Sequence, residues 1–225
     1  MDKLKVIITG ATGMVGEGVL YECLQHQDVE KVLVITRKPT GYSNPKLKEI
    51  IHSNFSDVSS LSEQLKGYNA CYFCMGVTSV GKKEPEFTKL TYTLTLGFAT
   101  TLANINHDMT FCYISGSGTD STEHGRIMWA RVKGKTENDL MKLPFKQVYN
   151  FRPAAIEPFL PLKPTQTYYK AIRYTSWLFP VLRVIAPNYI ITLRDLAKAM
   201  INSSLRGYTK SILEVRDINL LAKKN

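Results

Sequence analysis

The sequence predicts an α/β fold: a doubly wound parallel sheet, of the Rossmann type, with helices on both faces. Three observations support this. Short apolar runs alternate with stretches of helical periodicity, a glycine-rich turn follows the first apolar run, and 44% of the 225 residues are hydrophobic. Alternation of this kind favours parallel strands joined by crossover helices. A chain of this length is typical of one domain, and we expect one over residues 1–225.

Six strands are predicted where apolar residues cluster, and four helical patterns are predicted between them. The strands are expected at Leu4–Thr9, Lys31–Thr36, Leu47–His52, Ala70–Met75, Thr110–Ser115 and Gln147–Arg152. The helices are expected at about 13–26, 58–66, 86–106 and 125–142. Each prediction rests on hydrophobic periodicity and on the turn residues that bound it.

The pattern changes after Arg152, where prolines interrupt any regular element. These are Pro153, Pro158, Pro161 and Pro164. In folds of this kind the C-terminal segment usually builds the substrate side of the cleft. We therefore expect about residues 155–225 to form a small C-terminal substrate lobe.

Within that lobe, regular structure is predicted to resume at Thr192. Asp195 stands three residues further on, which is the spacing of a capping box at a helix start. The helix is expected to run to Leu205 and to end at Gly207. A short strand at Ile212–Val215 and a terminal helix follow.

The turn after the first strand carries the strongest functional signal. It reads Thr9-Gly10-Ala11-Thr12-Gly13-Met14-Val15-Gly16. Gly10 allows a sharp turn, Gly13 allows backbone to approach a diphosphate, and Gly16 allows the next helix to pack closely on the sheet. The helix start offers unpaired N–H groups and a positive dipole end to the phosphates. In this strand–turn–helix context the motif predicts a bound dinucleotide, with contacts from Gly10, Thr12, Gly13, Met14, Val15 and Gly16.

The end of the second strand indicates which dinucleotide. A site for NAD usually has a carboxylate there, which binds the ribose hydroxyls. This strand instead runs into Arg37 and Lys38, two cations suited to a 2′-phosphate. We therefore predict NADP(H). The alternative is that these two cations are ordinary surface charges.

Further cofactor contacts are expected at the carboxyl ends of the other strands, where ligands bind in such sheets. After the third strand these are Asn54 and Phe55, and after the sixth Pro153. The fourth strand ends in the predicted contacts Cys74, Gly76, Val77 and Thr78, and the fifth ends at Ser115.

Taken together, these motifs resemble the atypical short-chain dehydrogenase/reductases. Within them the chain is similar to the group of Tat-interacting oxidoreductase-like proteins and of bacterial proteins labelled NAD-dependent epimerase/dehydratase. The resemblance covers about residues 4–156. Its motifs are Thr9–Gly16, Ile35–Lys38, Cys74–Thr78, Tyr113–Ser115, Val132–Gly134 with Glu137, and Phe151–Pro153.

The resemblance implies hydride transfer to or from a nicotinamide. In the family a tyrosine is the acid/base, a lysine one helical turn later binds ribose and lowers the tyrosine pKa, and a serine orients the substrate. Lys133 matches the lysine, and Ser115 or Ser117 matches the serine. The tyrosine position holds Trp129, whose indole N–H is only a donor.

Two hypotheses follow for function. In the first, the chain is an oxidoreductase on a small carbonyl or alcohol, and its proton donor is Tyr168, Tyr169, His124 or a water held by Ser115 or Ser117. General acid catalysis is worth ~10²–10⁴-fold, so a displaced donor still supports turnover. In the second, the chain binds NADP(H) without turnover and acts as a regulatory or scaffold protein, because bound nucleotide stabilises the native state.

The expected partner is a small-molecule substrate with an apolar body and an anionic end. Residues 151–225 carry 12 Lys/Arg against 4 Asp/Glu, and a basic stretch rich in aromatics runs from Thr167 to Ala186, with Pro180 inside it. We interpret this stretch as a pocket wall. The alternatives are contact with an anionic membrane surface and a solvated basic face. No motif for nucleic acid accompanies the charge.

The remaining composition points to an ordinary cytoplasmic protein. The N-terminus leads straight into a strand without a signal peptide, and no apolar run has membrane-spanning length. The four cysteines are expected to be reduced and buried, and neither they nor the four histidines show the spacing of a metal site.

Overall fold

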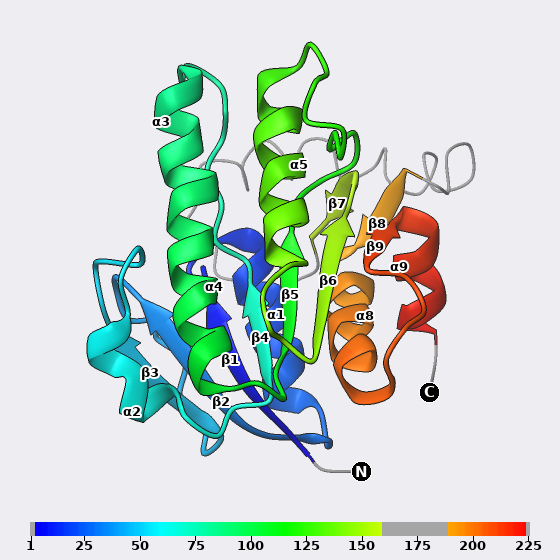
Figure 1. Cartoon of the computed structure of the whole chain (residues 1–225). Helices are drawn as coiled ribbons and strands as arrows, with labels where there is room; N and C mark the ends of the chain where they lie inside the picture. Colours follow the sequence, from blue (N-terminus) through cyan, green and yellow to red (C-terminus); the bar gives the residue numbers. More distant parts are fainter. Residues whose placement is uncertain (1–2, 159–188, 224–225) are drawn as a thin grey trace.

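The computed structural model describes residues 3–158 and 189–223 (Figure 1). Its main sheet has seven strands in the order β3-β2-β1-β4-β5-β6-β9, and every neighbouring pair is parallel. The strands are β1 Leu4–Thr9, β2 Val29–Thr36, β3 Leu47–Ile51, β4 Ala70–Phe73, β5 Thr110–Ile114, β6 Gln147–Arg152 and β9 Ile212–Glu214. Chain direction therefore places all carboxyl ends along one edge of the sheet, and the predicted doubly wound fold is confirmed.

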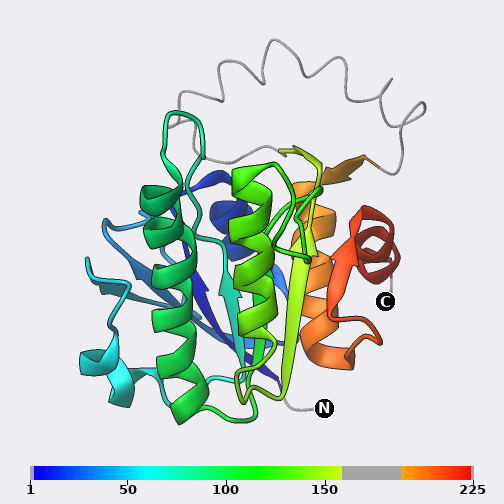
Figure 2. The ribbon, with the colours of Figure 1, turned by 45° about the horizontal axis from the view of Figure 1, so that its top comes forward.

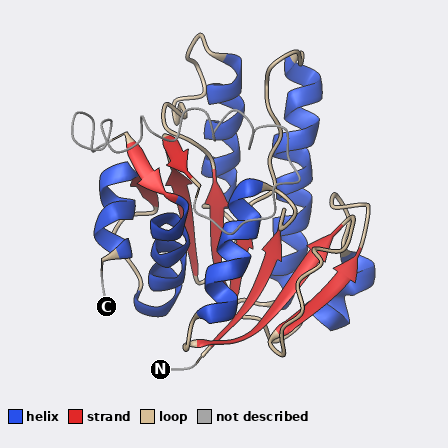
Figure 3. Ribbon diagram, turned by 180° about the vertical axis from the view of Figure 1, so that it is seen from behind, coloured by secondary structure: helices blue, strands red, loops and turns tan. Residues whose placement is uncertain are grey.

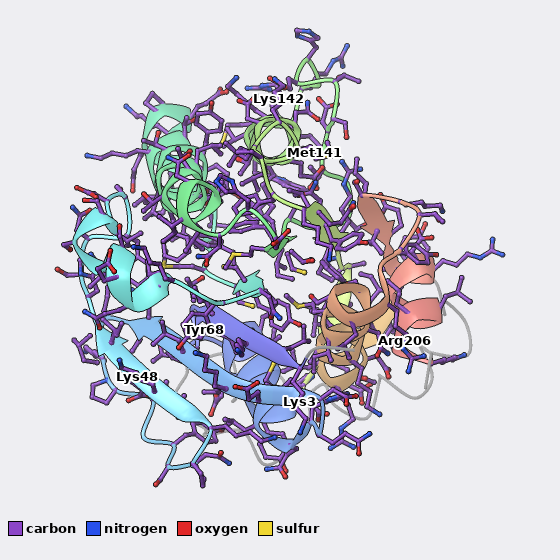
Figure 4. The ribbon with its side chains drawn as sticks, turned by 60° about the horizontal axis from the view of Figure 1, so that its bottom comes forward. Lys3, Lys48, Tyr68, Met141, Lys142 and Arg206 are labelled. Carbon is purple, nitrogen blue, oxygen red and sulfur yellow. The ribbon has the colours of Figure 1, made fainter. Side chains whose placement is uncertain are left out.

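Helices cover both faces of this sheet, as Figure 4 shows from the end where the strands begin. On one face α1 (Met14–Gln25) packs beside α8 (Leu193–Arg206), and α9 (Val215–Ala222) packs on α8 (Figure 3). On the other face lie α2 (Ser62–Leu65), α4 (Leu94–Ile105) and α5 (Met128–Leu140).

The core is divided by the sheet into two apolar layers. In β1, Val6 and Ile8 face α1 and α8, whereas Ile7 faces the layer beneath α4, and all three are fully buried. A strand buried on both faces must be apolar along its whole length. This is why the continuous apolar runs in the sequence identify the strands so well.

The strand ends differ slightly from those predicted, with one consequence for the site. β4 ends at Phe73, two residues early, so Cys74 and Met75 already belong to the loop. Their backbone leaves the sheet beside the glycine turn that follows β1. At β2 the strand begins two residues earlier than predicted.

The helix expected at about 86–106 is interrupted. It consists of α3 (Glu84–Thr88), a π-helical turn at Lys89–Thr93 and then α4. Such a turn contains one residue more than an α-helical turn. Within it the Tyr92 hydroxyl donates to Asp139 Oδ2 of α5 at 2.8 Å. Likewise the pattern at about 58–66 begins as a 3₁₀ turn at Ser59–Leu61 before α2.

The described part of residues 155–225 contributes β9 and α8 to the body of the fold. β9 pairs with β6 at the sheet edge, and α8 packs on α1. The reason lies in close packing: a Cβ added at Gly18 of α1 would lie 2.4 Å from the Leu193 side chain of α8. The substrate role of residues 155–225 remains a prediction.

Two short strands beyond the sheet edge were not expected. β7 (Ala155–Glu157) and β8 (Ile190–Thr192) pair in parallel past the carboxyl end of β6 (Figure 2). The prolines of this region exclude a long element, but three residues suffice for a pair. The aromatic stretch from Thr167 to Ala186, including Tyr168 and Tyr169, lies outside the described residues.

The N-cap half of the capping box predicted at α8 is confirmed, whereas the Asp195 carboxylate accepts from the Thr192 hydroxyl at 2.5 Å and not from its amide. The Thr192 hydroxyl accepts a hydrogen bond from the Asp195 amide at 3.0 Å. At the other end Gly207 has φ +71°, which favours glycine and ends the helix.

Candidate functional site

The glycine turn between β1 and α1 has little room for side chains. Gly10 has φ +70°, and a Cβ added there would lie 2.8 Å from backbone atoms of Cys74 and Met75. A Cβ on Gly16 would lie 2.2 Å from the Gly10 carbonyl oxygen. Gly16 therefore brings the helix onto the turn itself, whereas we expected contact with the sheet.

Gly13 differs from the other two glycines. It is the residue before α1, with φ −96°, which any residue can adopt. A Cβ added there would lie 3.3 Å from the Gly10 carbonyl oxygen, and Gly13 borders open space in the cleft described below. A side chain at this position would therefore extend into the cleft, where it would obstruct a ligand more than it would disturb the packing of the protein.

The first turn of α1 is suited to an anion. The amides of Met14, Val15 and Gly16 fall in the first helical turn, where backbone N–H groups have no intrahelical carbonyl to bind. The positive end of the helix dipole lies at the same point. The Gly13 amide donates to the Gly10 carbonyl at 2.9 Å, which holds the turn in shape. These features fit a diphosphate.

A cleft of about 230 Å³ opens beside this turn, at the carboxyl ends of β1, β2 and β4. It brings together seven of the predicted contacts. They are Gly10, Thr12, Gly13, Arg37, Phe55, Cys74 and Gly76, and the lining also includes Ile35, Thr36 and Met75. Among the described residues that line it, Arg37 is the single charged one. The cleft therefore presents one cation and no carboxylate.

Other predicted contacts lie outside this lining. Lys38, Asn54, Val77 and Thr78 are exposed on the adjoining loops. The Asn54 carboxamide oxygen accepts from the Ser56 amide at 3.2 Å. These residues remain predictions that depend on how a ligand fills the cleft.

The turn that carries Arg37 is internally bonded. The Thr36 hydroxyl donates to the Lys38 carbonyl at 2.8 Å. Nearby Phe55 is only 4% exposed, and its ring stacks on Phe98 of α4, so it lines the cleft mainly as a wall of the core.

A second group of predicted residues meets at the carboxyl ends of β5 and β6. The Lys133 ammonium donates to the Ser115 carbonyl oxygen. The Ser115 hydroxyl is buried and donates to the Phe151 carbonyl at 3.1 Å. The Ser117 amide donates to the Pro153 carbonyl at 2.9 Å. The structure thus joins Ser115, Lys133 and Pro153, and turns the Ser115 hydroxyl towards β6.

Burial changes the chemistry of Lys133. Loss of hydration lowers the pKa of its ammonium from the ordinary 10.5 to about 8, and the nearby Glu137 carboxylate opposes this shift. Glu137 is itself fully buried and is paired with Arg152. The Lys133 ammonium is therefore a stronger acid than that of an exposed lysine.

Trp129 lies one helical turn before Lys133 on α5, as the sequence spacing predicts. Its ring packs against the loop after β5: a Cβ added at Gly118 would lie 3.5 Å from Trp129 Cη2. His124, another candidate proton donor, is exposed in the same loop.

This loop is fastened to α5 by a contact that the sequence analysis missed. A Cβ at Gly134 would lie 1.7 Å from the Asp120 carbonyl oxygen, so only glycine fits there. The Asp120 side chain accepts from the Gly125 amide at 2.7 Å and from the Thr122 amide at 3.0 Å. An isolated glycine inside a predicted helix is a signal for such close packing.

The ion pair between Glu137 and Arg152 was also missed as a structural feature, although both residues occur in the matched motifs. Neither residue alone indicates its partner, because they lie fifteen positions apart on different elements.

Cysteines and possible metal ligands add no further site in the described part of the chain. Cys23, Cys71 and Cys112 are buried and Cys74 is partly exposed, all as free thiols. Burial raises the pKa of Cys112 to about 12. Over residues 3–158 and 189–223 no cluster of three or more His, Cys, Asp or Glu side chains is placed to hold a metal ion. None of the helices in those ranges combines the length and apolarity needed to cross a bilayer.

The strand order, the glycine turn and the cleft define a dinucleotide-binding α/β protein of the Rossmann type. The model of the NAD dependent epimerase/dehydratase family matches residues 6–119, and the chain belongs to that family. Its curated relatives include members of the atypical short-chain dehydrogenase/reductases, so the resemblance drawn from the motifs is confirmed.

Three of these relatives show how similar they are to this chain and how much of their length the match covers. Leucinostatins biosynthesis cluster protein T of Purpureocillium lilacinum is 30% identical over 62% of this chain and 52% of its own length. The mitochondrial protein FMP52 of Debaryomyces hansenii is 24% identical over 68% of this chain and 67% of its own. Rat HTATIP2 is 23% identical over 69% of this chain and 64% of its own length. The match thus spans about half to two thirds of these relatives.

Solved structures share the fold at low identity. A UDP-N-acetylglucosamine 4-epimerase from Methanobrevibacter ruminantium has a TM-score of 0.67 and 15% identity, over 95% of this chain and 76% of its own. WbmG of Bordetella bronchiseptica, solved with NAD, has a TM-score of 0.64 and 14% identity, over 97% of this chain and 77% of its own. At such identity the likeness establishes the fold alone.

Proposed function

We propose that this protein is an NADP(H)-dependent oxidoreductase that acts on a small carbonyl or alcohol. The observation that carries the proposal is the pairing of two features at one edge of the sheet. One is a cleft in which Arg37 is the single charged residue of the described lining. The other is the partly buried Lys133 side chain, whose ammonium donates to the Ser115 carbonyl where β5 ends.

Each feature has a chemical role. The glycine turn and the first-turn amides of α1 hold the diphosphate. The Arg37 guanidinium, with Lys38 beside it, binds the adenosine 2′-phosphate by charge-assisted hydrogen bonds. When bound, the cofactor supplies or accepts a hydride. Lys133 holds the ribose, and Ser115 or Ser117 orients the substrate, as the family resemblance implies.

The loops around the site support a substrate with an apolar body. Val77 and Val80 follow β4, Ile127 precedes α5 and Tyr189 precedes β8, and all four are exposed. Such side chains at the mouth of a site favour apolar ligands. Lys83 is exposed on the same loop as Val80 and favours an anionic end on the substrate.

The cofactor preference is tested by titrating NADPH and NADH into the wild-type chain and into Arg37→Glu. We expect wild type to bind NADPH more tightly than NADH. The variant should lose at least ~10-fold in NADPH affinity, since one charge-assisted contact is worth about 1.5–3 kcal/mol. Lys48→Glu makes the same charge change outside the cleft lining and serves as the control. Equal affinities in wild type would end the case for NADP(H).

Turnover is tested by following NADPH absorbance with a panel of aldehydes, ketones and quinones that differ in apolar length and in terminal charge. Oxidation of NADPH that depends on the carbonyl supports the proposal. Tight binding without turnover across the panel would refute the catalytic part and leave the cofactor part standing.

Trp129 favours a second candidate: a regulatory or scaffold protein that binds NADP(H) without chemistry. An indole at the position of the family's acid/base tyrosine cannot exchange a proton at neutral pH. Trp129→Tyr separates the two. If the wild-type chain is a scaffold without turnover, Trp129→Tyr should introduce carbonyl reduction. If the wild-type chain is an oxidoreductase whose proton donor lies elsewhere, Trp129→Tyr should leave its turnover within a few-fold of wild type.

A further inference from the structure

An oxidoreductase with Trp129 at the tyrosine position needs another source for the proton that the substrate oxygen receives. Among the described candidates, His124 and a water held by Ser115 fit poorly. The Ser115 hydroxyl donates to the Phe151 carbonyl, and His124 is exposed on the loop after β5. The group that does lie at the junction of β5, β6 and α5 is the Lys133 ammonium.

Lys133 is placed by the surrounding backbone. Its ammonium donates to the Ser115 carbonyl, and it lies 3.9 Å from the point where a Cβ of Gly116 would stand. The Pro153 carbonyl oxygen lies 3.9 Å from that same point. Because Gly116 has no side chain, the lysine head can approach the loop. An ammonium has three N–H donors, so one bond to Ser115 leaves others for a ligand.

The charges around Lys133 are already engaged with one another. Glu137, one turn further along α5, accepts two hydrogen bonds from Arg152 of β6, and Arg152 also donates to Glu214 of β9. On the outer side of α5, Arg131 pairs with Glu84, and Lys135 lies near Asp139 and Glu123. Lys133 is therefore a partly buried cation, and the nearby Glu137 carboxylate is already paired with Arg152.

We propose that Lys133 Nζ is itself the general acid that protonates the substrate oxygen during carbonyl reduction, and the base in the reverse direction. This rests on the proposed function. Reduction adds a hydride at the carbonyl carbon, which the reduced cofactor supplies, and a proton at oxygen. The Nζ–H bond breaks as the O–H bond forms, and the neutral amine regains its proton from water.

The acidity of the group supports this role. A catalytic acid works best when its pKa is near the working pH, and an ordinary lysine at 10.5 is too weak an acid. Burial lowers the pKa of Lys133 to about 8. Lowering of a lysine pKa by burial is a known route to acid/base function.

The experiment combines two measurements on the full chain. The first is an NMR titration of protein labelled with ¹³Cε-lysine, in which the Lys133 resonance is assigned by its loss in Lys133→Arg. We expect a midpoint near 8 for this resonance, well below the midpoints of the surface lysines. The second is the pH dependence of carbonyl reduction, which should fall above the same midpoint as the ammonium is lost.

Variants separate this role from simple cofactor binding. Lys133→Arg keeps a cation that donates hydrogen bonds but does not release a proton. We expect kcat to fall by ~10²–10⁴-fold, with the Kd for NADPH within about tenfold of wild type. Tyr168→Phe and Tyr169→Phe test the competing donors, and neither should remove the fall in kcat above the Lys133 midpoint.

Several outcomes would overturn the inference while leaving the oxidoreductase proposal intact. They are a Lys133 midpoint above 10, turnover by Lys133→Arg close to wild type, or disappearance of the alkaline fall in kcat in either tyrosine variant. Absence of turnover by the wild-type chain with every carbonyl, despite NADPH binding, would instead remove the catalytic proposal and this inference together.

Discussion

Glu137 of α5 and Arg152 of β6 form a buried ion pair through two hydrogen bonds. Arg152 Nε lies 3.0 Å from Glu137 Oε1, and a terminal nitrogen of the same guanidinium lies 2.5 Å from Oε2. Arg152 also donates to the Ser121 hydroxyl and to Glu214. One guanidinium thus links α5, the loop after β5, β6 and the strand β9.

Removal of one partner from this pair should be strongly destabilising. Glu137→Gln or Arg152→Met leaves an uncompensated charge in the core, which typically costs about 3–5 kcal/mol. Urea denaturation measures the free energy of unfolding. Glu137→Leu combined with Arg152→Met should cost clearly less than the sum of the single changes. Strict additivity would show that the two side chains do not interact.

Gly134→Ala should displace the loop after β5 from α5. An added Cβ would lie 1.7 Å from the Asp120 carbonyl oxygen. Overpacking of this kind costs about 1–3 kcal/mol, which exceeds the gain of about 1 kcal/mol in helix propensity. Urea denaturation should therefore show a net loss. Gly76→Ala is the matched control, since a Cβ there meets nothing within 4 Å. A stabilised Gly134→Ala protein would contradict the packing described here.

Gly13→Ala and Gly16→Ala should separate ligand binding from folding. At Gly13 the added methyl group borders the cleft, so NADPH affinity should fall at least ~10-fold while stability changes by about 1 kcal/mol or less. At Gly16 the methyl group would lie 2.2 Å from the Gly10 carbonyl oxygen, so stability should fall without cofactor. Calorimetric titration and urea denaturation report the two quantities. Equal effects at both glycines would argue against a diphosphate at Gly13.

The buried Lys133 should make stability depend on pH. Below pH 8 the ammonium is charged in both native and unfolded chains, and the native state bears the full cost of burying it. Between pH 8 and about 10.5 the unfolded chain binds more protons than the native one, so stability rises with pH, by at most about 1.4 kcal/mol per pH unit. Lys133→Met should be more stable than wild type at pH 7, by about 1–3 kcal/mol.

The pH dependence of the stability difference between Lys133→Met and wild type tests this account. The advantage of Lys133→Met should shrink as pH rises from 8 to 10.5, because wild type recovers stability over that range. Lys48→Met, at an exposed position on β3, should show a pH-independent difference near zero. A constant difference for Lys133→Met across this range would mean that burial does not lower the lysine pKa.

Much of the fold could be predicted from the sequence because its signals are local. Apolar runs such as Val6–Ile8 are buried on both faces of a parallel sheet, so they identify strands without knowledge of their neighbours. The Gly10 turn has its own backbone requirement, φ +70°, which the residue type reveals. Thr192 with Asp195 marks a helix start through hydrogen bonds within one turn.

The site was predictable to the extent that topology brings strand ends together. The order of alternating elements placed Gly10, Arg37 and Cys74 at one edge of the sheet, and the cleft joins them. Met75 was missed as a lining residue because β4 ends earlier than its apolar run. Strand ends depend on hydrogen bonds to neighbouring strands, which the sequence of one strand does not contain.

By itself, then, the sequence determined what backbone geometry and chain order require: a parallel sheet, a glycine turn before a helix, and cations after the second strand. Only the tertiary structure decided that β9 completes the sheet, that Arg152 neutralises Glu137, and that Lys133 is buried enough to titrate near pH 8. The reason is physical. Local conformation follows from a residue and its neighbours along the chain, whereas burial, pairing and pKa depend on groups that meet only after folding.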